Sequence, residues 1–167
     1  MSNPNKRSYT VYINSNDKMS GTANNSAQYQ INWDDLLDRK YNSYKLYWNL
    51  TTESDLYENT STGFSASIAT VNVDFGGKTY SFDTKNKSSS TCIGYIYRDA
   101  PTTSTTFNSF SCTHLQNSPK MLDRPTQNFI TVSINLLTVD TNGNAHSDMG
   151  GYSMQLEFIP VEDSKIE

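Results

Sequence analysis

The feature that most constrains the fold is a period of two in hydrophobicity, which recurs in short runs along the chain. Between residues 8 and 14, Tyr9, Val11 and Ile13 alternate with polar residues. The same alternation returns in residues 27–33, 43–51, 129–139 and 152–161. Successive side chains of a β-strand point to opposite faces of a sheet, so each run predicts a strand with one buried face.

Further strands are expected in the middle of the chain, at residues 64–75, 91–98 and 107–113. Residues 113–128, which include Pro119 and Pro125, are expected to be irregular. Because the runs 129–139 and 152–161 are both strongly alternating and follow one another, we expect them to pair.

A hairpin is predicted at the glycine pair Gly76-Gly77. Glycine accepts the positive φ that tight hairpin turns require. In this register Val73 would face Tyr80, and Val71 would face Phe82. Before the turn the alternation changes phase near Ile68 and Ala69, which predicts a one-residue bulge there.

These strands number about eight or nine, and several of the loops between them exceed ten residues. Long crossings are typical of Greek-key sandwiches and jelly rolls, whereas a plain meander has short turns. We therefore predict an all-β fold, an antiparallel two-sheet sandwich of the single jelly-roll type. Residues 1–167 are expected to form one domain with a short flexible N-terminal arm at about residues 1–7.

The segment from Asp34 to Lys40 interrupts the alternation and predicts a single helical turn. Asp34 is expected to cap this turn and to place Leu36 and Leu37 against the body of the protein. Asp34, Asp35 and Asp38 form an acidic cluster, for which a solvated turn is favoured over a cation site.

Composition excludes several function classes. The net charge is −4, and Lys6 with Arg7 is the densest basic spot, so direct nucleic-acid binding is not expected. No apolar run is long enough for a transmembrane helix, and the polar N-terminus has no secretory signal. Aromatic residues make up 12% of the chain, and Trp33 and Trp48 lie in phase with the buried faces of their strands. We expect both to be core residues and not platforms for a sugar.

The sequence contains few candidates for catalysis. Cys112 and His114 are two residues apart and would share one face of a strand, but no nucleophile motif surrounds them. His146 is the only other histidine. We therefore predict that the protein is not an enzyme and assign no catalytic residue.

Metal, cofactor and disulfide sites are not predicted either. The loop from Asp140 to Asp148 has oxygen side chains at alternate positions, yet it departs from the EF-hand pattern and also fits a plain connection between strands. Cys92 and Cys112 are expected to be reduced thiols packed as small apolar groups.

Two stretches resemble a known family. The beginning and the end of the chain are similar to those of small single jelly-roll capsid proteins. The beginning is Y-T-V-Y-I-N-S-N-D-K-M-S-G-T (9–22). The end is F-I-T-V-S-I-N-L-L (129–137) followed by Y-S-M-Q-L-E-F-I-P-V (152–161), which would serve as the last two strands. These proteins occur in icosahedral double-stranded DNA viruses of eukaryotes, including virophages. The resemblance covers about a quarter of the chain and carries no diagnostic motif.

The resemblance implies a structural virion protein, a penton or minor capsid subunit of two four-stranded sheets in which the first and last strands are neighbours. It implies self-assembly, as a homopentamer, and contact with other capsid proteins, inside the host cell and then in the virion. The alternative is a β-sandwich module that binds a carbohydrate or a host receptor, which is supported by the aromatic residues and the polar loops.

Overall fold

The computed structural model describes residues 7–20, 26–52, 68–76, 81–83, 88–98, 110–111, 119–137 and 151–162. The strands in these ranges are β1 (Tyr9–Asn14), β2 (Ser26–Gln30), β3 (Ser43–Thr52), β4 (Ile68–Asp74), β5 (Ser81–Asp83), β6 (Ser88–Ser90), β7 (Cys92–Arg98), β8 (Phe110–Ser111), β9 (Lys120–Asp123), β10 (Phe129–Leu137) and β11 (Tyr152–Pro160). A 3-10 turn, η1 (Ser15–Asp17), follows β1, and a helical turn, α1 (Trp33–Leu36), follows β2. The arm at residues 1–6 lies outside the described ranges.

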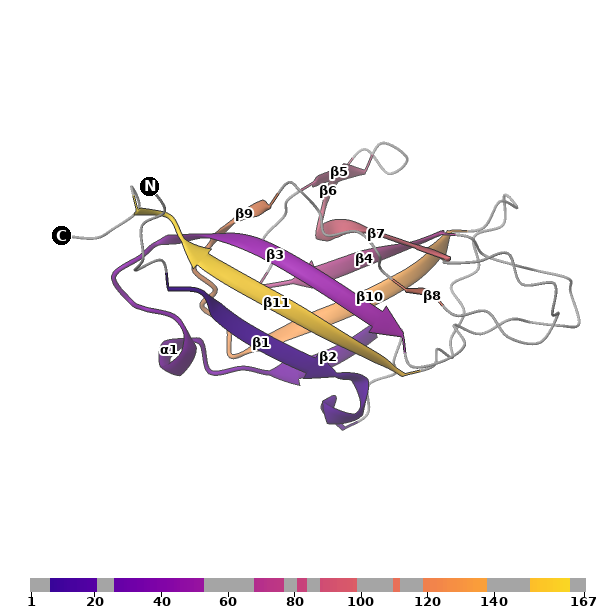
Figure 1. Ribbon diagram of the computed structural model, residues 1–167, viewed down its shortest axis with the longest axis horizontal. Coiled ribbons are helices and arrows are strands. Elements are labelled where there is room, and N and C mark those ends of the chain that lie inside the picture. Colours follow the sequence, from indigo (N-terminus) through magenta and orange to yellow (C-terminus); the bar gives the residue numbers. More distant parts are fainter. Residues whose placement is uncertain are drawn as a thin grey trace, which may run out of the picture.

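The main strands form two antiparallel layers that cover one another (Figure 1). Sheet I has the order β1-β11-β3-β9, and sheet II has the order β2-β10-β4-β7. The two-residue strand β8 pairs with both β3 and β7 and joins the layers at one end. Within the described ranges, β5 and β6 pair with each other and with no other strand. The predicted all-β, antiparallel two-sheet sandwich is confirmed.

The core lies between the two layers and consists of the residues that the alternation places on one face of each strand. Every second residue of β3, β4, β10 and β11 is buried, which gives one apolar face per strand. Trp33, which follows β2 at the start of α1, packs edge-on against Phe158 of β11 at 5.5 Å between ring centroids. Phe75 lies 6.0 Å from Phe158, so aromatic rings from both layers meet in one cluster.

The predicted strand partners are wrong in two places. β10 does not pair with β11: it lies between β2 and β4, while β11 lies between β1 and β3. The hairpin at Gly76-Gly77 is also wrong, because both edges of β4 are occupied by β10 and β7. Phe82 of β5 pairs with Ser89 of β6 instead. β10 and β11 thus pair with strands distant in sequence, and β4 has β10 on one side and β7 on the other.

The bulge is displaced and lies in the neighbouring strand. Ile68 and Ala69 pair regularly with both β10 and β7. The register shifts further along, where Val71 faces Gly94 while Asn72 faces Cys92 of β7. The extra residue therefore belongs to β7.

A glycine is nevertheless required after β4. Gly76 has a φ of +91°, and a Cβ at this position would lie 3.0 Å from the Gln127 side chain. The positive φ explains why this position is a glycine.

Candidate functional site

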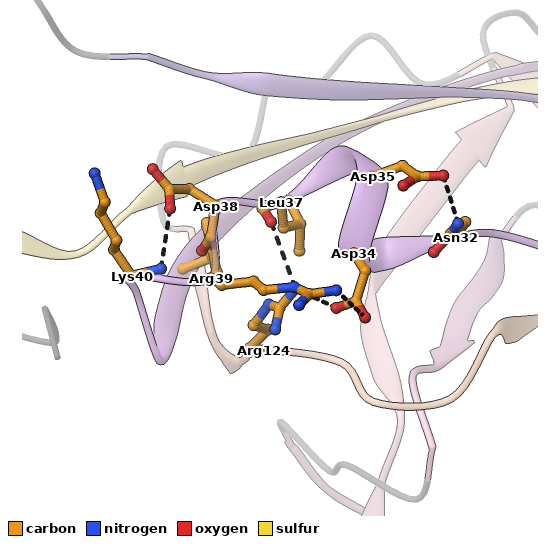
Figure 2. Close-up of polar contacts among 9 residues, drawn as sticks. Asn32, Asp34, Asp35, Leu37, Asp38, Arg39, Lys40 and Arg124 are labelled. Carbon is orange, nitrogen blue, oxygen red and sulfur yellow. Dashed lines mark hydrogen bonds and ion pairs between the residues drawn. The ribbon is translucent and has the colours of Figure 1, made fainter.

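The helical turn after β2 brings together the acidic residues singled out in the sequence. α1 is a single turn, as predicted, and Leu37, the residue that follows it, is buried. Its N-cap is Asn32 and not Asp34, because the helix begins at Trp33, two residues earlier than a cap at Asp34 implies. The Asn32 amide donates a hydrogen bond to the Asp35 carboxylate (Figure 2).

Asp34 is held by two guanidinium groups. Arg39 lies 2.8 Å from one carboxylate oxygen, and Arg124, from the segment after β9, lies 2.7 Å from the other (Figure 2). The Arg124 backbone N–H also donates to the Asn42 carbonyl at 2.7 Å. Arg124 therefore joins two segments that are about 90 residues apart in sequence and connects the turn to the edge of sheet I.

Asp38 closes the same turn through its backbone and its side chain. Its carboxylate accepts the Lys40 backbone N–H at 3.0 Å, and its carbonyl accepts the Tyr44 hydroxyl at 2.6 Å. Burial, together with the charge of nearby Tyr9, raises the pKa of Tyr44 to about 12, so this donor stays protonated at neutral pH. The three carboxylates thus have different partners, and no group of metal-ligating side chains is found within the described residues.

The Asp34 contacts make a testable prediction about acid stability. The hydrogen bond from Arg124, assisted by Arg39, holds the pKa of Asp34 below its ordinary value despite partial desolvation. A carboxyl group with a lowered pKa stabilises the fold above its unfolded-state pKa, and this contribution disappears as the pH falls through the folded-state pKa. We expect the difference in the free energy of unfolding between the wild type and Asp34→Asn to shrink as the pH falls from about 5 to about 2.

Urea denaturation at several pH values measures this difference, with Asp35→Asn as the matched control, because Asp35 contacts an amide and not a guanidinium. A difference between wild type and Asp34→Asn that is constant over this pH range would show that the two arginines do not stabilise the carboxylate.

The outer face of sheet I carries a shallow hollow of about 330 Å³ beside η1. Tyr12 of β1, Asn49 of β3 and Gln155 of β11 lie opposite one another across the three strands. Among the described residues that line the hollow, Asp17 of η1 is the one with a charged side chain. The two amides and the tyrosine can offer hydrogen bonds and apolar contact to a bound group.

The outer face of sheet II is almost free of charge. Among the side chains that the structure describes on this face, Asp74 is the one that belongs to an acidic or basic residue. The others are Ser26, Gln28, Gln30, Thr70, Asn72, Cys92, Tyr95, Phe129, Thr131, Ser133 and Asn135. Several of them bond along the sheet, as Asn72 does to the Thr70 hydroxyl at 3.1 Å. We call this surface the uncharged face.

A buried polar contact joins the two sheets. The hydroxyl groups of Tyr29 in β2 and Tyr152 in β11 are 2.9 Å apart, and both side chains are buried. The backbone N–H of Tyr152 donates to the hydroxyl of Ser15 in η1 at 3.0 Å. Burial raises the pKa of both tyrosines, so the contact is a hydrogen bond between neutral groups.

Several sequence candidates can now be placed. Trp33 and Trp48 are 2% and 4% exposed, which confirms them as core residues. Cys92 is half-buried on the uncharged face, and its thiol donates to the Gly94 carbonyl at 3.3 Å. The other candidates, Lys6, Cys112, His114, His146 and the loop 140–148, lie outside the described residues.

Sequence reasoning missed Arg124 and the strand before it. Residues 113–128 were expected to be irregular, but Lys120–Asp123 forms β9 on the edge of β3. The run is only four residues long and lies between two prolines, so its alternation is too short to stand out. Leu122 is the buried residue of this strand, and its apolar side chain is the signal in the sequence that indicates an inward face.

No protein-family model matches the chain, and no curated protein matches it. Across the ranges that the structure covers, none of the helices has the length and apolar character needed to cross a membrane.

Proposed function

We propose that this protein is a structural virion subunit, a self-assembling single jelly-roll capsid protein at a penton or minor capsid position. The observation that carries the proposal is the route of the chain between the two layers. In chain order the main strands fall in sheets I, II, I, II, II, I, II and I. A chain that alternates between two four-stranded sheets in this way supports a jelly roll, in which Greek-key crossings wind the strands around one core.

The position of the chain ends supports the same proposal. The resemblance to capsid proteins implies that the first and last strands are neighbours, and β1 pairs with β11 along its whole length, from Tyr9 opposite Phe158 to Asn14 opposite Ser153. This pairing was not expected from the alternation of β11, which favoured β10 as its partner. It is therefore a separate observation in support of the capsid-like topology.

The uncharged face is suited to contact with neighbouring subunits. Charged residues are depleted in the centre of protein interfaces, because each buried charge must lose its hydration shell. Two exposed aromatic residues on this face, Tyr95 and Phe129, provide apolar area for such contacts. An assembling subunit needs surfaces of this kind on a rigid body.

The carbohydrate-binding alternative receives less support. Tryptophan platforms for a sugar must be exposed, and both tryptophans of the chain are in the core. The proposal therefore remains the assembling subunit.

Assembly can be measured on the purified chain. We expect mass photometry and multi-angle light scattering to detect a species of five times the 18.8 kDa chain mass. Tyr95→Lys and Phe129→Lys, which place a charge on the uncharged face, are expected to reduce this species, whereas Asn49→Lys on sheet I is the control. Immunogold labelling of intact particles tests the location. A strictly monomeric protein that is absent from particles would refute the proposal.

A further inference from the structure

The four sheet edges of the sandwich differ in how they are protected. An edge strand exposes unpaired N–H and C=O groups and is a template for a further strand unless it is short, charged, interrupted by proline or covered. β9 is four residues long, carries Lys120 and Asp123 and is flanked by prolines. β2 is covered in part by Met19, whose N–H donates to the Gln28 carbonyl at 2.7 Å. β7 is covered at its end by β8.

β1 has none of these protections within the described part of the chain. Among the strands that the structure describes, it is the terminal strand of sheet I and pairs with β11 alone. Its six residues, Y-T-V-Y-I-N, contain no charge and no proline. Tyr12, in the middle of the strand, is 78% exposed, and the inward-facing Tyr9 and Val11 are only partly buried although they pack against the core. A strand added here would cover both apolar side chains.

The charges at the two ends of β1 select the orientation of that strand. Arg7 precedes β1 and Asp17 ends η1 just after it, and both are exposed, whereas Lys18 beside Asp17 is half-buried. If a second copy pairs antiparallel, the Arg7 end of one strand lies beside the Asp17 end of the other, twice in the pair. A parallel arrangement would instead place like charges together. Antiparallel pairing of identical strands is also the self-complementary contact that two-fold symmetry requires.

We propose that β1 is a two-fold contact through which two copies of this chain join their sheets I edge to edge. Tyr12 faces its own copy at the two-fold axis, and Val11 faces Ile13 of the other copy on the inner side. The contact goes beyond the proposed function, because a cyclic pentamer must use other surfaces and a two-fold contact would link subunits of different rings.

Exchange of the end charges tests the contact without altering the core. Arg7→Asp and Asp17→Arg are each expected to raise the dimer dissociation constant about tenfold, since each places like charges together at two symmetric positions. The double variant Arg7→Asp/Asp17→Arg restores opposite charges and is expected to return close to the wild-type value. Sedimentation equilibrium at low ionic strength measures all four proteins. Single variants that dimerise like the wild type, or a double variant weaker than both, would overturn the proposal.

Cross-linking tests the register. In a background of Cys92→Ser and Cys112→Ser, Tyr12→Cys places two thiols opposite each other across the axis. Residues directly opposite in antiparallel strands have Cβ atoms about 4.5–5.5 Å apart, which is close to disulfide geometry. We expect a reducible dimer on mild oxidation, and none from the control Asn49→Cys, which lies on the same outer face but on β3, two strands away from Tyr12. Equal cross-linking of both variants would overturn the register.

The two proposals fail separately. If the pentamer forms in the charge variants while the dimer is lost, both stand. If the wild-type protein dimerises and no pentamer forms, the β1 contact stands and the vertex assembly does not. A wild-type protein with no dimer at any concentration overturns the contact whatever the larger assembly does.

Discussion

Replacement of Phe158 by alanine is expected to lower the free energy of unfolding by about 3–5 kcal/mol. Phe158 is fully buried and is the common neighbour of three aromatic rings, Trp33 at 5.5 Å, Phe75 at 6.0 Å and Tyr44 at 6.4 Å. Loss of this ring removes apolar contacts from both sheets and from α1 at once, and a close-packed core relaxes only partly around the space. The loss is a large part of the stability of an ordinary domain, which is about 5–15 kcal/mol.

Urea denaturation measures the effect, and the chain provides a matched control. Phe129→Ala makes the same chemical change at a side chain that is 41% exposed on sheet II, and we expect its cost to be about 1 kcal/mol or less. If the alanine variant does not fold, Phe158→Leu replaces it in the measurement, because leucine keeps most of the side-chain volume and the protein is expected to stay folded. Similar costs for Phe158→Ala and Phe129→Ala would show that the ring cluster is not the centre of the core.

Phe158 is a sharper test than Trp33, although both lie in the cluster. The Trp33 indole nitrogen is buried and has no hydrogen-bond partner among the described residues. A buried donor without a partner carries a desolvation cost, so removal of the indole would relieve this cost while it removes apolar contact. The two effects oppose each other in Trp33→Ala, whereas Phe158→Ala reports packing alone.

The faces of the strands could be predicted from the sequence because they depend on local alternation. The inward sets of the predicted strands, such as Leu46 and Leu50 of β3 or Val132 and Ile134 of β10, are buried as expected. Alternation with a period of two determines which side chains share a face of the strand. Burial of the apolar face then follows from the hydrophobic effect. The sandwich itself was predictable for the same reason.

The neighbours of each strand could not be predicted in this way. Alternation is the same whichever strand lies alongside, so β11 satisfied the pattern equally well beside β10 or between β1 and β3. The glycines at 76–77 indicated a local turn, and Gly76 does adopt a positive φ, but the two edges of β4 are filled by β10 and β7. Partner choice depends on the packing of the whole sheet.

The candidate site was predictable only in part. The acidic turn was found from its interruption of the alternation, but its partner Arg124 lies about 90 residues away and no local signal connects the two. The uncharged face was likewise hidden, because its residues come from four strands and gather only when sheet II forms. Tyr12 is out of phase with Tyr9, Val11 and Ile13, which the alternation singled out, and its importance depends on β1 being an edge.

The buried pair of tyrosine hydroxyl groups should show strongly non-additive energetics. Tyr152→Phe leaves the Tyr29 hydroxyl, 2.9 Å away in the wild type, buried without this partner, and Tyr29→Phe does the same to Tyr152. Each single variant is expected to lose about 1–3 kcal/mol of stability. The double variant replaces both hydroxyl groups by apolar ring edges, which leaves no stranded polar group, so its loss is expected to be smaller than the sum of the two single losses by at least about 1 kcal/mol.

A double-mutant cycle in urea measures this coupling, with Tyr44→Phe as the control because the Tyr44 hydroxyl donates to a backbone carbonyl and not to either tyrosine. Tyr29 belongs to sheet II and Tyr152 to sheet I, so a positive coupling shows that the two layers are held in register by a specific polar contact as well as by apolar packing. Strictly additive losses would mean that the two hydroxyl groups find separate partners, and the register of the layers would then depend on the aromatic cluster around Phe158.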